Sequence, residues 1–123
     1  MRAPNVWASF RFAFAGIAHA WRTQRNFRIH VAVTAAVLAA GAWLELSTDQ
    51  WALLALTIGV VLQAELLNTA LEAVVDHVAP EFHALAKAAK DCAAGAVFLS
   101  AGVAVMVGLL VLGPRLLARL GFS

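Results

Sequence analysis

The sequence predicts an all-α membrane protein with three transmembrane helices preceded by an N-terminal amphipathic surface helix. Of its 123 residues, 63% are hydrophobic and 13% are charged, whereas soluble domains are about 45–50% apolar and about 25% charged. Three apolar stretches lie at about 31–46, 51–75 and 93–112. Each is near the roughly 20 residues that a helix needs to cross a bilayer, although the first is short. A chain of this length is expected to form one domain.

The N-terminal stretch, about 5–25, has large apolar residues at steps of three and four. They are Trp7, Phe10, Phe14, Ile17 and Trp21. This spacing is typical of a helix that lies in the membrane interface, with its aromatic face toward lipid and its arginines toward the headgroups. The same face would also suit packing in a helical bundle, and the two interpretations are compatible.

Basic residues are distributed unevenly along the chain, which predicts its orientation. The N-terminal segment carries Arg2, Arg11, Arg22, Arg25 and Arg28, and no lysine or arginine follows before Lys87. Because Lys and Arg concentrate in cytoplasmic segments, we expect a cytoplasmic N-terminus. A short turn at Ser47–Gln50 then lies outside and a longer polar connection, Asp76–Lys90, lies inside. This asymmetry indicates membrane orientation rather than nucleic-acid binding.

Polar side chains form a stripe at the end of the second apolar stretch. At 100° per residue, one helical face carries Glu65, Asn68, Thr69, Glu72 and Asp76. A carboxylate near the centre of a bilayer costs roughly 2.5–3.5 kcal/mol on insertion scales, so several in register indicate a site. Three interpretations remain open from the residues alone: a lipid- or phosphate-handling site, an ion or proton path, and ion pairs that hold an oligomer together. Three helices cannot easily enclose such a stripe, so we expect a homo-oligomer.

The residue types in the stripe suggest individual roles. Glu65 would lie deepest in the membrane and is a candidate general base. Glu72 and Asp76 would lie nearer the cytoplasm and offer the oxygen ligands that Mg²⁺ prefers. Asn68 can orient a hydroxyl or a phosphate oxygen.

A second polar cluster opens the third apolar stretch. Lys87, Lys90 and Asp91 share one helical face, and a lysine at the start of a helix can hold an anionic phosphate. A base, a divalent cation and such a lysine are the components that phosphoryl transfer requires. The chain lacks both the phosphate loop and the dinucleotide fingerprint of soluble nucleotide-binding proteins. Its histidines, His19, His30, His77 and His83, show no metal-ligand spacing and are interpreted as loop or interface residues.

The segment Glu65–Asp76 resembles the signature of the prokaryotic diacylglycerol kinase family, which are small integral-membrane lipid kinases. The spacing Glu-x-x-Asn-Thr/Ser-Ala-x-Glu-x-x-x-Asp is specific, and Asn26–His30 and Glu81–Asp91 also resemble the family. The resemblance covers the whole chain and implies one lipid kinase domain over 1–123. It further implies a homotrimer with active sites shared between neighbouring subunits. The implied reaction is ATP- and Mg²⁺-dependent phosphorylation of a lipid alcohol at the cytoplasmic face of a bacterial inner membrane.

The resemblance also implies roles for individual residues. Glu65 matches the catalytic base, Glu72 a metal-binding carboxylate and Asn68 a residue that orients substrate or phosphate. The implied nucleotide-binding residues are Asp76, Glu81, His83, Lys90 and Asp91. Better-known diacylglycerol kinases carry a glutamate, a second metal ligand, where this chain has Gln24. A glutamine offers a carbonyl oxygen but no charge, which puts the number or affinity of the metal ions in question rather than the reaction class.

The family divides into diacylglycerol kinases and undecaprenol kinases. The segments Arg25–His30, Pro80–His83 and Ala93–Val97 look more like the undecaprenol kinase branch. Undecaprenol is therefore the expected substrate and diacylglycerol the alternative. An oligomeric ion or proton path is the non-enzymatic alternative, and the Lys90-Asp91 pair discriminates against it because a proton path does not need a nucleotide site.

Overall fold

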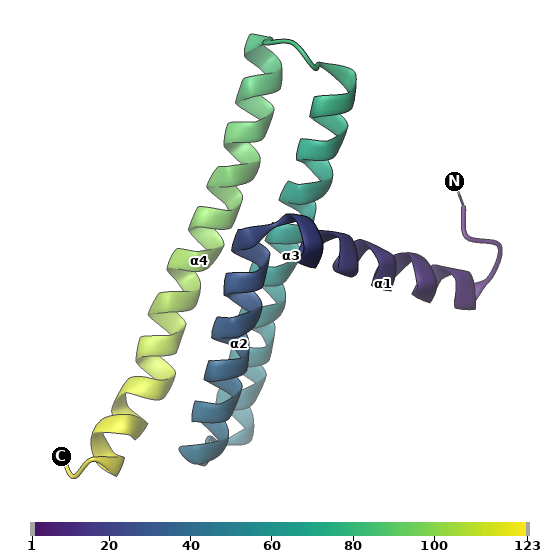
Figure 1. Cartoon of the computed structure of the whole chain (residues 1–123). Helices are drawn as coiled ribbons and strands as arrows, with labels where there is room; N and C mark the ends of the chain where they lie inside the picture. Colours follow the sequence, from purple (N-terminus) through teal and green to yellow (C-terminus); the bar gives the residue numbers. More distant parts are fainter. Residues whose placement is uncertain (1, 123) are drawn as a thin grey trace.

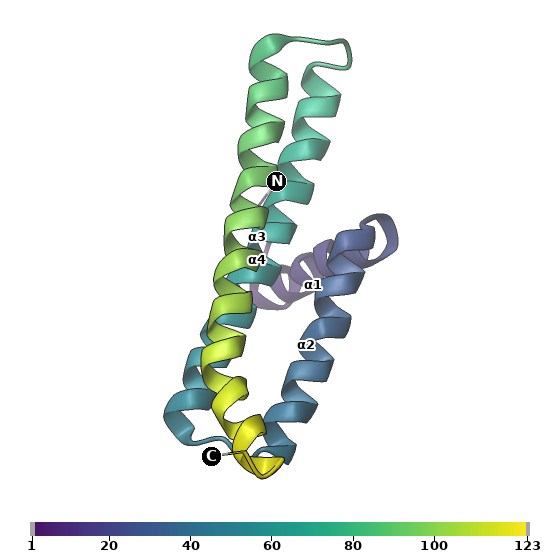
Figure 2. The same ribbon diagram turned by 90° about the vertical axis from the view of Figure 1, so that its left-hand side faces the viewer.

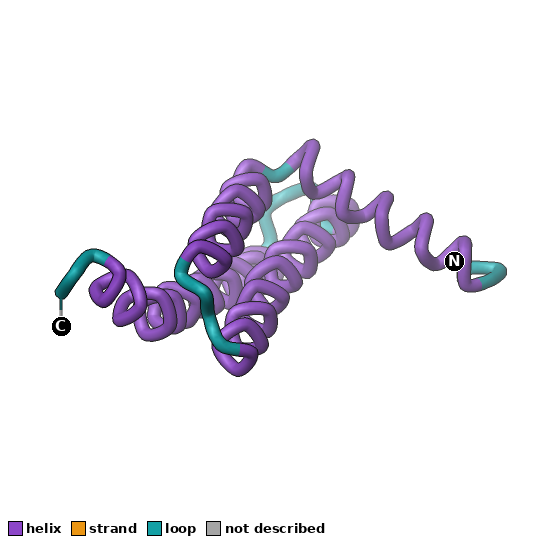
Figure 3. The backbone as a smooth tube through the Cα atoms, turned by 90° about the horizontal axis from the view of Figure 1, so that it is seen from below, coloured by secondary structure: helices purple, strands orange, loops and turns teal. Residues whose placement is uncertain are grey.

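The computed structural model describes residues 2–122, which contain four helices and no β-strand. The helices are α1 (Val6–Thr23), α2 (Arg25–Trp43), α3 (Thr48–Val78) and α4 (Ala84–Arg119). The expected all-helical fold is confirmed. Helices α2, α3 and α4 form a bundle, and α1 projects sideways from it (Figures 1 and 3).

Two of these helices, α3 and α4, are long and apolar enough to cross a membrane. Only 6% of the residues in the most apolar part of α4 are buried within the chain, against 22% of those in the corresponding part of α3. Apolar faces this open need lipid or other protein chains as their surroundings. The first expected span corresponds to α2, which has 19 residues and is not one of these two helices.

The turn between α2 and α3 lies earlier in the chain than the predicted Ser47–Gln50. Helix α2 ends at Trp43, and Glu45 adopts a left-handed conformation with φ of 55°. Ser47 then caps α3 through a reciprocal capping box. Its hydroxyl oxygen accepts from the Gln50 N–H at 3.3 Å, and Gln50 Oε1 accepts from the Ser47 N–H at 3.0 Å. The prediction was wrong because polar residues that favour a turn also favour the first turn of a helix.

The connection between α3 and α4 is much shorter than the predicted Asp76–Lys90. Helix α3 continues to Val78 and α4 begins at Ala84, so only residues 79–83 connect them. Pro80 interrupts the helix locally, but the polar residues on either side of it remain helical. Helix α4 also extends beyond the predicted 93–112 in both directions.

The pairing of α3 with α4 dominates the bundle, and α2 packs along only part of it. The joined end of α3 and α4 extends beyond both α2 and α1 (Figures 1 and 2). The corner between α1 and α2 is held by Arg28, whose Nη1 donates to the Trp21 carbonyl oxygen at 2.6 Å. This bond satisfies a carbonyl at the end of α1.

The apolar core lies at the opposite end of the bundle, near the α2–α3 turn. Its buried members are Leu44, Leu46, Leu54 and Val111. Arg115 near the end of α4 donates to the backbone oxygen of Glu45 at 2.9 Å. The core and this bond fasten α4 to the α2–α3 turn and leave the other end of the bundle to carry the polar stripe.

Candidate active site

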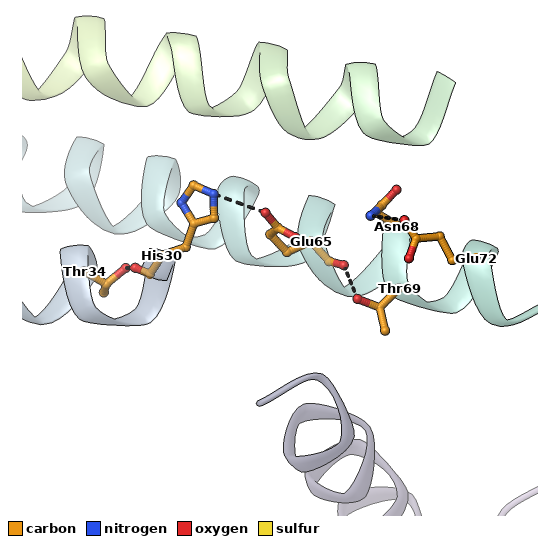
Figure 4. A network of polar contacts seen from close by, with 6 residues as sticks. All are labelled: His30, Thr34, Glu65, Asn68, Thr69 and Glu72. Atoms are coloured by element: carbon orange, nitrogen blue, oxygen red, sulfur yellow. Dashed lines mark hydrogen bonds and ion pairs between the residues drawn. The ribbon is translucent and has the colours of Figure 1, made fainter. Parts of the chain in front are cut away.

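Glu65 is the most deeply buried charged residue of the polar stripe, with an exposed fraction of 2%. Its Oε1 lies 3.1 Å from Nε2 of His30 on α2 (Figure 4). One turn further along α3, the Thr69 hydroxyl donates to the backbone oxygen of Glu65 at 2.9 Å. A buried carboxylate is costly unless it is paired, so the His30 contact explains how this helix tolerates Glu65.

Asn68 and Glu72 form the next part of the stripe. Asn68 Nδ2 donates to Glu72 Oε1 at 3.2 Å, a contact between residues four positions apart on α3 (Figure 4). The other amide atom, Asn68 Oδ1, is buried and has no hydrogen-bond partner among the described residues. An unpartnered buried oxygen beside a carboxylate is suited to a donor or a cation that the chain itself does not supply.

Three of the predicted nucleotide-binding residues, Asp76, Lys90 and Asp91, form ion pairs at the end shared by α3 and α4. Lys90 Nζ lies 2.7 Å from Asp76 Oδ1, which bridges the two helices. Lys87 Nζ lies 2.6 Å from Asp91 Oδ2, one turn apart on α4. All four side chains are exposed enough to meet a water-soluble ligand. Because such pairs are individually weak, their groups remain available to a phosphate or a cation.

The remaining predicted residues lie outside these contacts. His83 caps α4, and its Nδ1 accepts from the Leu85 N–H at 3.1 Å. Glu81 is exposed in the connection between α3 and α4. Gln24 sits at the corner between α1 and α2, where its backbone N–H bonds to the Ala20 carbonyl oxygen at 2.8 Å. Within residues 2–122, no group of three or more His, Cys, Asp or Glu side chains is arranged to hold a metal ion.

The sequence interpretation missed His30, which it treated as a loop or interface residue. The structure places this side chain on α2 against the candidate base. Sequence spacing carries no signal for this contact, because the two residues are 35 positions apart and lie on different helices. Two indications were available: His30 ends the segment Asn26–His30 that resembles the family, and it stands at the boundary between the arginine-rich segment and the first apolar stretch.

An apolar groove runs between α2, α3 and α4 and has a volume of about 490 Å³. Most of its lining side chains are aliphatic, including Val33, Val61 and Leu109. His30, near the start of α2, also lines the groove and so connects it to the Glu65 carboxylate. This arrangement places a hydrocarbon-compatible surface beside the most buried acid of the chain.

Comparisons with known proteins show which family the chain belongs to. A model of the prokaryotic diacylglycerol kinase family matches residues 11–112. A diacylglycerol kinase from Synechocystis is 55% identical over 94% of this chain and 67% of its own length. The undecaprenol kinase of Bacillus subtilis is 47% identical over 88% of each chain. A diacylglycerol kinase from Escherichia coli K12 is 36% identical over 82% of this chain and 83% of its own. The chain therefore belongs to the prokaryotic diacylglycerol kinase family and is a lipid kinase.

Proposed function

We propose that this protein transfers the γ-phosphate of ATP to the hydroxyl of undecaprenol at the cytoplasmic face of a bacterial inner membrane. The observation that carries the proposal is the position of Glu65. It is a buried carboxylate that contacts His30 at one end of an apolar groove. A lipid tail in the groove would bring its terminal hydroxyl to this carboxylate.

The arrangement of α1 against the bundle supports a definite placement in the membrane. Helix α1 projects sideways (Figure 1), and its exposed residues include Trp7, Phe10 and Phe14. Aromatic residues of this kind are enriched where a helix lies in the interface. In the proposed multi-pass arrangement, α2 crosses the membrane together with α3 and α4. The arginine-rich N-terminus then lies in the cytoplasm.

Glu65 acts as the general base in this proposal. The lipid hydroxyl gives its proton to the Glu65 carboxylate while its oxygen attacks the γ-phosphorus of ATP. The bond between that phosphorus and the oxygen bridging to the β-phosphate breaks, and ADP leaves. The products are the lipid phosphate and ADP, and the proton on Glu65 is then released to water.

Mg²⁺ is the proposed metal cofactor, and Glu72 is the residue that would hold it. The fit rests on the donors present: the Glu72 carboxylate contacts the Asn68 amide through Nδ2, and Oδ1 of the same amide is buried without a partner among the described residues. Mg²⁺ is commonly bound by one or two carboxylates together with substrate phosphates and water. Gln24 would add at most a neutral oxygen. When bound, the cation neutralises charge on the transferring phosphoryl group.

The nucleotide is proposed to bind where α3 and α4 extend beyond α1. Lys90 is the residue for the phosphates, since its ammonium has three donors and only Asp76 is its ion-pair partner among the described residues. Asp76, Asp91, Glu81 and His83 complete the proposed nucleotide site. Their exposure suits contact with a water-soluble ligand.

A homotrimer with shared active sites is part of the proposal. The low burial of α4 within one chain leaves apolar surface that neighbouring subunits can cover. A neighbouring subunit could then supply the groups that the Glu72 region lacks within one chain.

Diacylglycerol is the second candidate substrate, and a specific observation favours it. The Synechocystis relative, which is 55% identical, is a diacylglycerol kinase. The undecaprenol assignment is supported by the Bacillus subtilis relative, which matches most of both chains. Both lipids present a primary hydroxyl at the same membrane depth, so Glu65 chemistry alone does not separate them.

The deciding experiment offers both lipids to the purified protein in mixed micelles with labelled ATP and Mg²⁺. Strong labelling of undecaprenol with little labelling of diacylglycerol is the expected result. The reverse result would assign the chain to diacylglycerol phosphorylation. Labelling of neither lipid would overturn both assignments.

A further inference from the structure

We propose that His30 is a positioning residue that holds the Glu65 carboxylate in place for proton transfer. This inference rests on the proposed function of Glu65 as the base. It starts from the 3.1 Å contact between His30 Nε2 and Glu65 Oε1. The Glu65 side chain is 3% exposed and the His30 side chain 23% exposed, so His30 is the more open partner.

Within residues 2–122, His30 is the only residue whose side chain makes a polar contact with the Glu65 carboxylate. The other bond at this residue, from Thr69, goes to its backbone oxygen. Among the described residues, the buried Oε1 has no hydrogen bond with good alignment, although the imidazole nitrogen lies within ion-pair distance. A long side chain with a single polar neighbour depends on that neighbour for its orientation.

His30 is itself held by its surroundings on α2. The Thr34 hydroxyl donates to the His30 backbone oxygen at 2.8 Å, within the same helix. Two residues before it, Arg28 joins α2 to the end of α1 through the Trp21 carbonyl oxygen. The imidazole therefore projects from a segment anchored at the corner of the molecule, and a residue that positions a catalytic group requires such support.

His30 also lines the groove between α2, α3 and α4. The same side chain thus faces both the candidate base and the space proposed for the lipid. A polar group at this junction would fix the carboxylate on the path of the incoming hydroxyl. A residue that served only to pack α2 against α3 would not need a ring nitrogen at this position.

The test compares variants that keep or remove the nitrogen near Glu65. His30→Leu removes it while keeping apolar bulk, and His30→Asn withdraws the polar group toward the backbone. His30→Gln carries an amide nitrogen near the position of Nε2. We expect His30→Leu and His30→Asn to lower kcat by about 10²-fold with little change in KM for ATP, as for a misplaced catalytic group. His30→Gln should recover most of the lost kcat.

His19→Leu and His19→Gln are the matched controls. His19 is an exposed histidine on α1 with no side-chain hydrogen bond or ion pair among the described residues. Both controls should retain wild-type kcat. The double variant Glu65→Gln/His30→Leu should be no slower than Glu65→Gln alone, because a residue that acts through Glu65 has no further effect once the base is gone.

Two results would overturn the inference. One is a folded His30→Leu or His30→Asn variant with wild-type kcat. The other is a folded His30→Gln variant as slow as His30→Leu. This result would mean that kcat does not depend on a nitrogen near Glu65. If the wild-type protein labels no lipid at all, the proposed function itself fails. If the wild type is active and the His30 variants keep its kcat, only the positioning role is overturned.

Discussion

Replacing Glu65 with glutamine separates the chemical role of this residue from its structural role. The side chain is 3% exposed and contacts His30 Nε2 at 3.1 Å. Glutamine has nearly the same shape, and its amide can still face the imidazole. The change also removes the desolvation cost of a buried carboxylate. We therefore expect the midpoint of thermal unfolding in detergent to stay within a few degrees of wild type.

The effect on catalysis should be far larger. An amide cannot accept the proton of a lipid hydroxyl, and a general base contributes typically 10²–10⁴-fold to rate. A loss of about 10²-fold corresponds to about 2.7 kcal/mol of transition-state stabilisation. Glu65→Gln should therefore lower kcat at least about 10²-fold while KM for ATP changes little, because the residue belongs to the lipid side of the site.

The assay is transfer of labelled phosphate in mixed micelles, with kcat and KM measured separately for ATP and lipid. Glu45→Gln is the matched control, since it makes the same substitution at an exposed carboxylate in the α2–α3 turn. The control should be as active as wild type. A folded Glu65→Gln variant whose kcat remains within tenfold of wild type would refute the assignment of Glu65 as the base.

Three other predictions address the nucleotide, the metal and the packing. Lys90→Ala should raise KM for ATP by about tenfold or more, and the charge-swapped Lys90→Asp/Asp76→Lys variant should share this defect even though it keeps an ion pair. Gln24→Glu should lower the Mg²⁺ concentration that gives half-maximal activity, because it adds a carboxylate ligand. Gly41→Val should lower the midpoint of thermal unfolding, because a Cβ there would lie 2.6 Å from Trp51 Cη2 and overpacking costs about 1–3 kcal/mol.

Each of these predictions has a contradicting outcome. If KM for ATP is unchanged in Lys90→Ala, or returns to the wild-type value in the charge-swapped variant, the role of Lys90 is purely structural. An unchanged Mg²⁺ requirement in Gln24→Glu would place Gln24 away from the metal. Gly59→Ala is the control for packing, since nothing lies within 4 Å of a Cβ at that glycine. Equal thermal midpoints for Gly41→Val and Gly59→Ala would contradict the close approach of α2 and α3.

The helices and the polar stripe could be predicted because both depend on local periodicity. Apolar runs define helices of sufficient length, and a step of 100° per residue places Glu65, Asn68 and Glu72 on one face. The structure shows this directly for Asn68 and Glu72, whose side chains meet one turn apart. A pattern within one helix needs no knowledge of the other helices.

The ends of α3 and α4 could not be predicted in the same way. Polarity near Asp76 and Lys90 was interpreted as a loop, but the two side chains pair across neighbouring helices at 2.7 Å. The contact between His30 and Glu65 was missed for the same reason. Both contacts depend on how separate helices pack, and sequence spacing does not carry that information.

The proposed reaction needs one site that meets a membrane-soluble acceptor and a water-soluble donor, and the gradient of burial along α3 suits this need. The side chain of Glu65 is 3% exposed, whereas the side chain of Asp76 is 65% exposed. The two residues are three turns apart on one face, a rise of about 16 Å. Helix α3 can therefore present a buried base at the groove and an open carboxylate toward the nucleotide without any change of direction. The projection of α3 and α4 beyond α1 (Figure 1) makes this possible, because shorter helices would end before the polar stripe reached water.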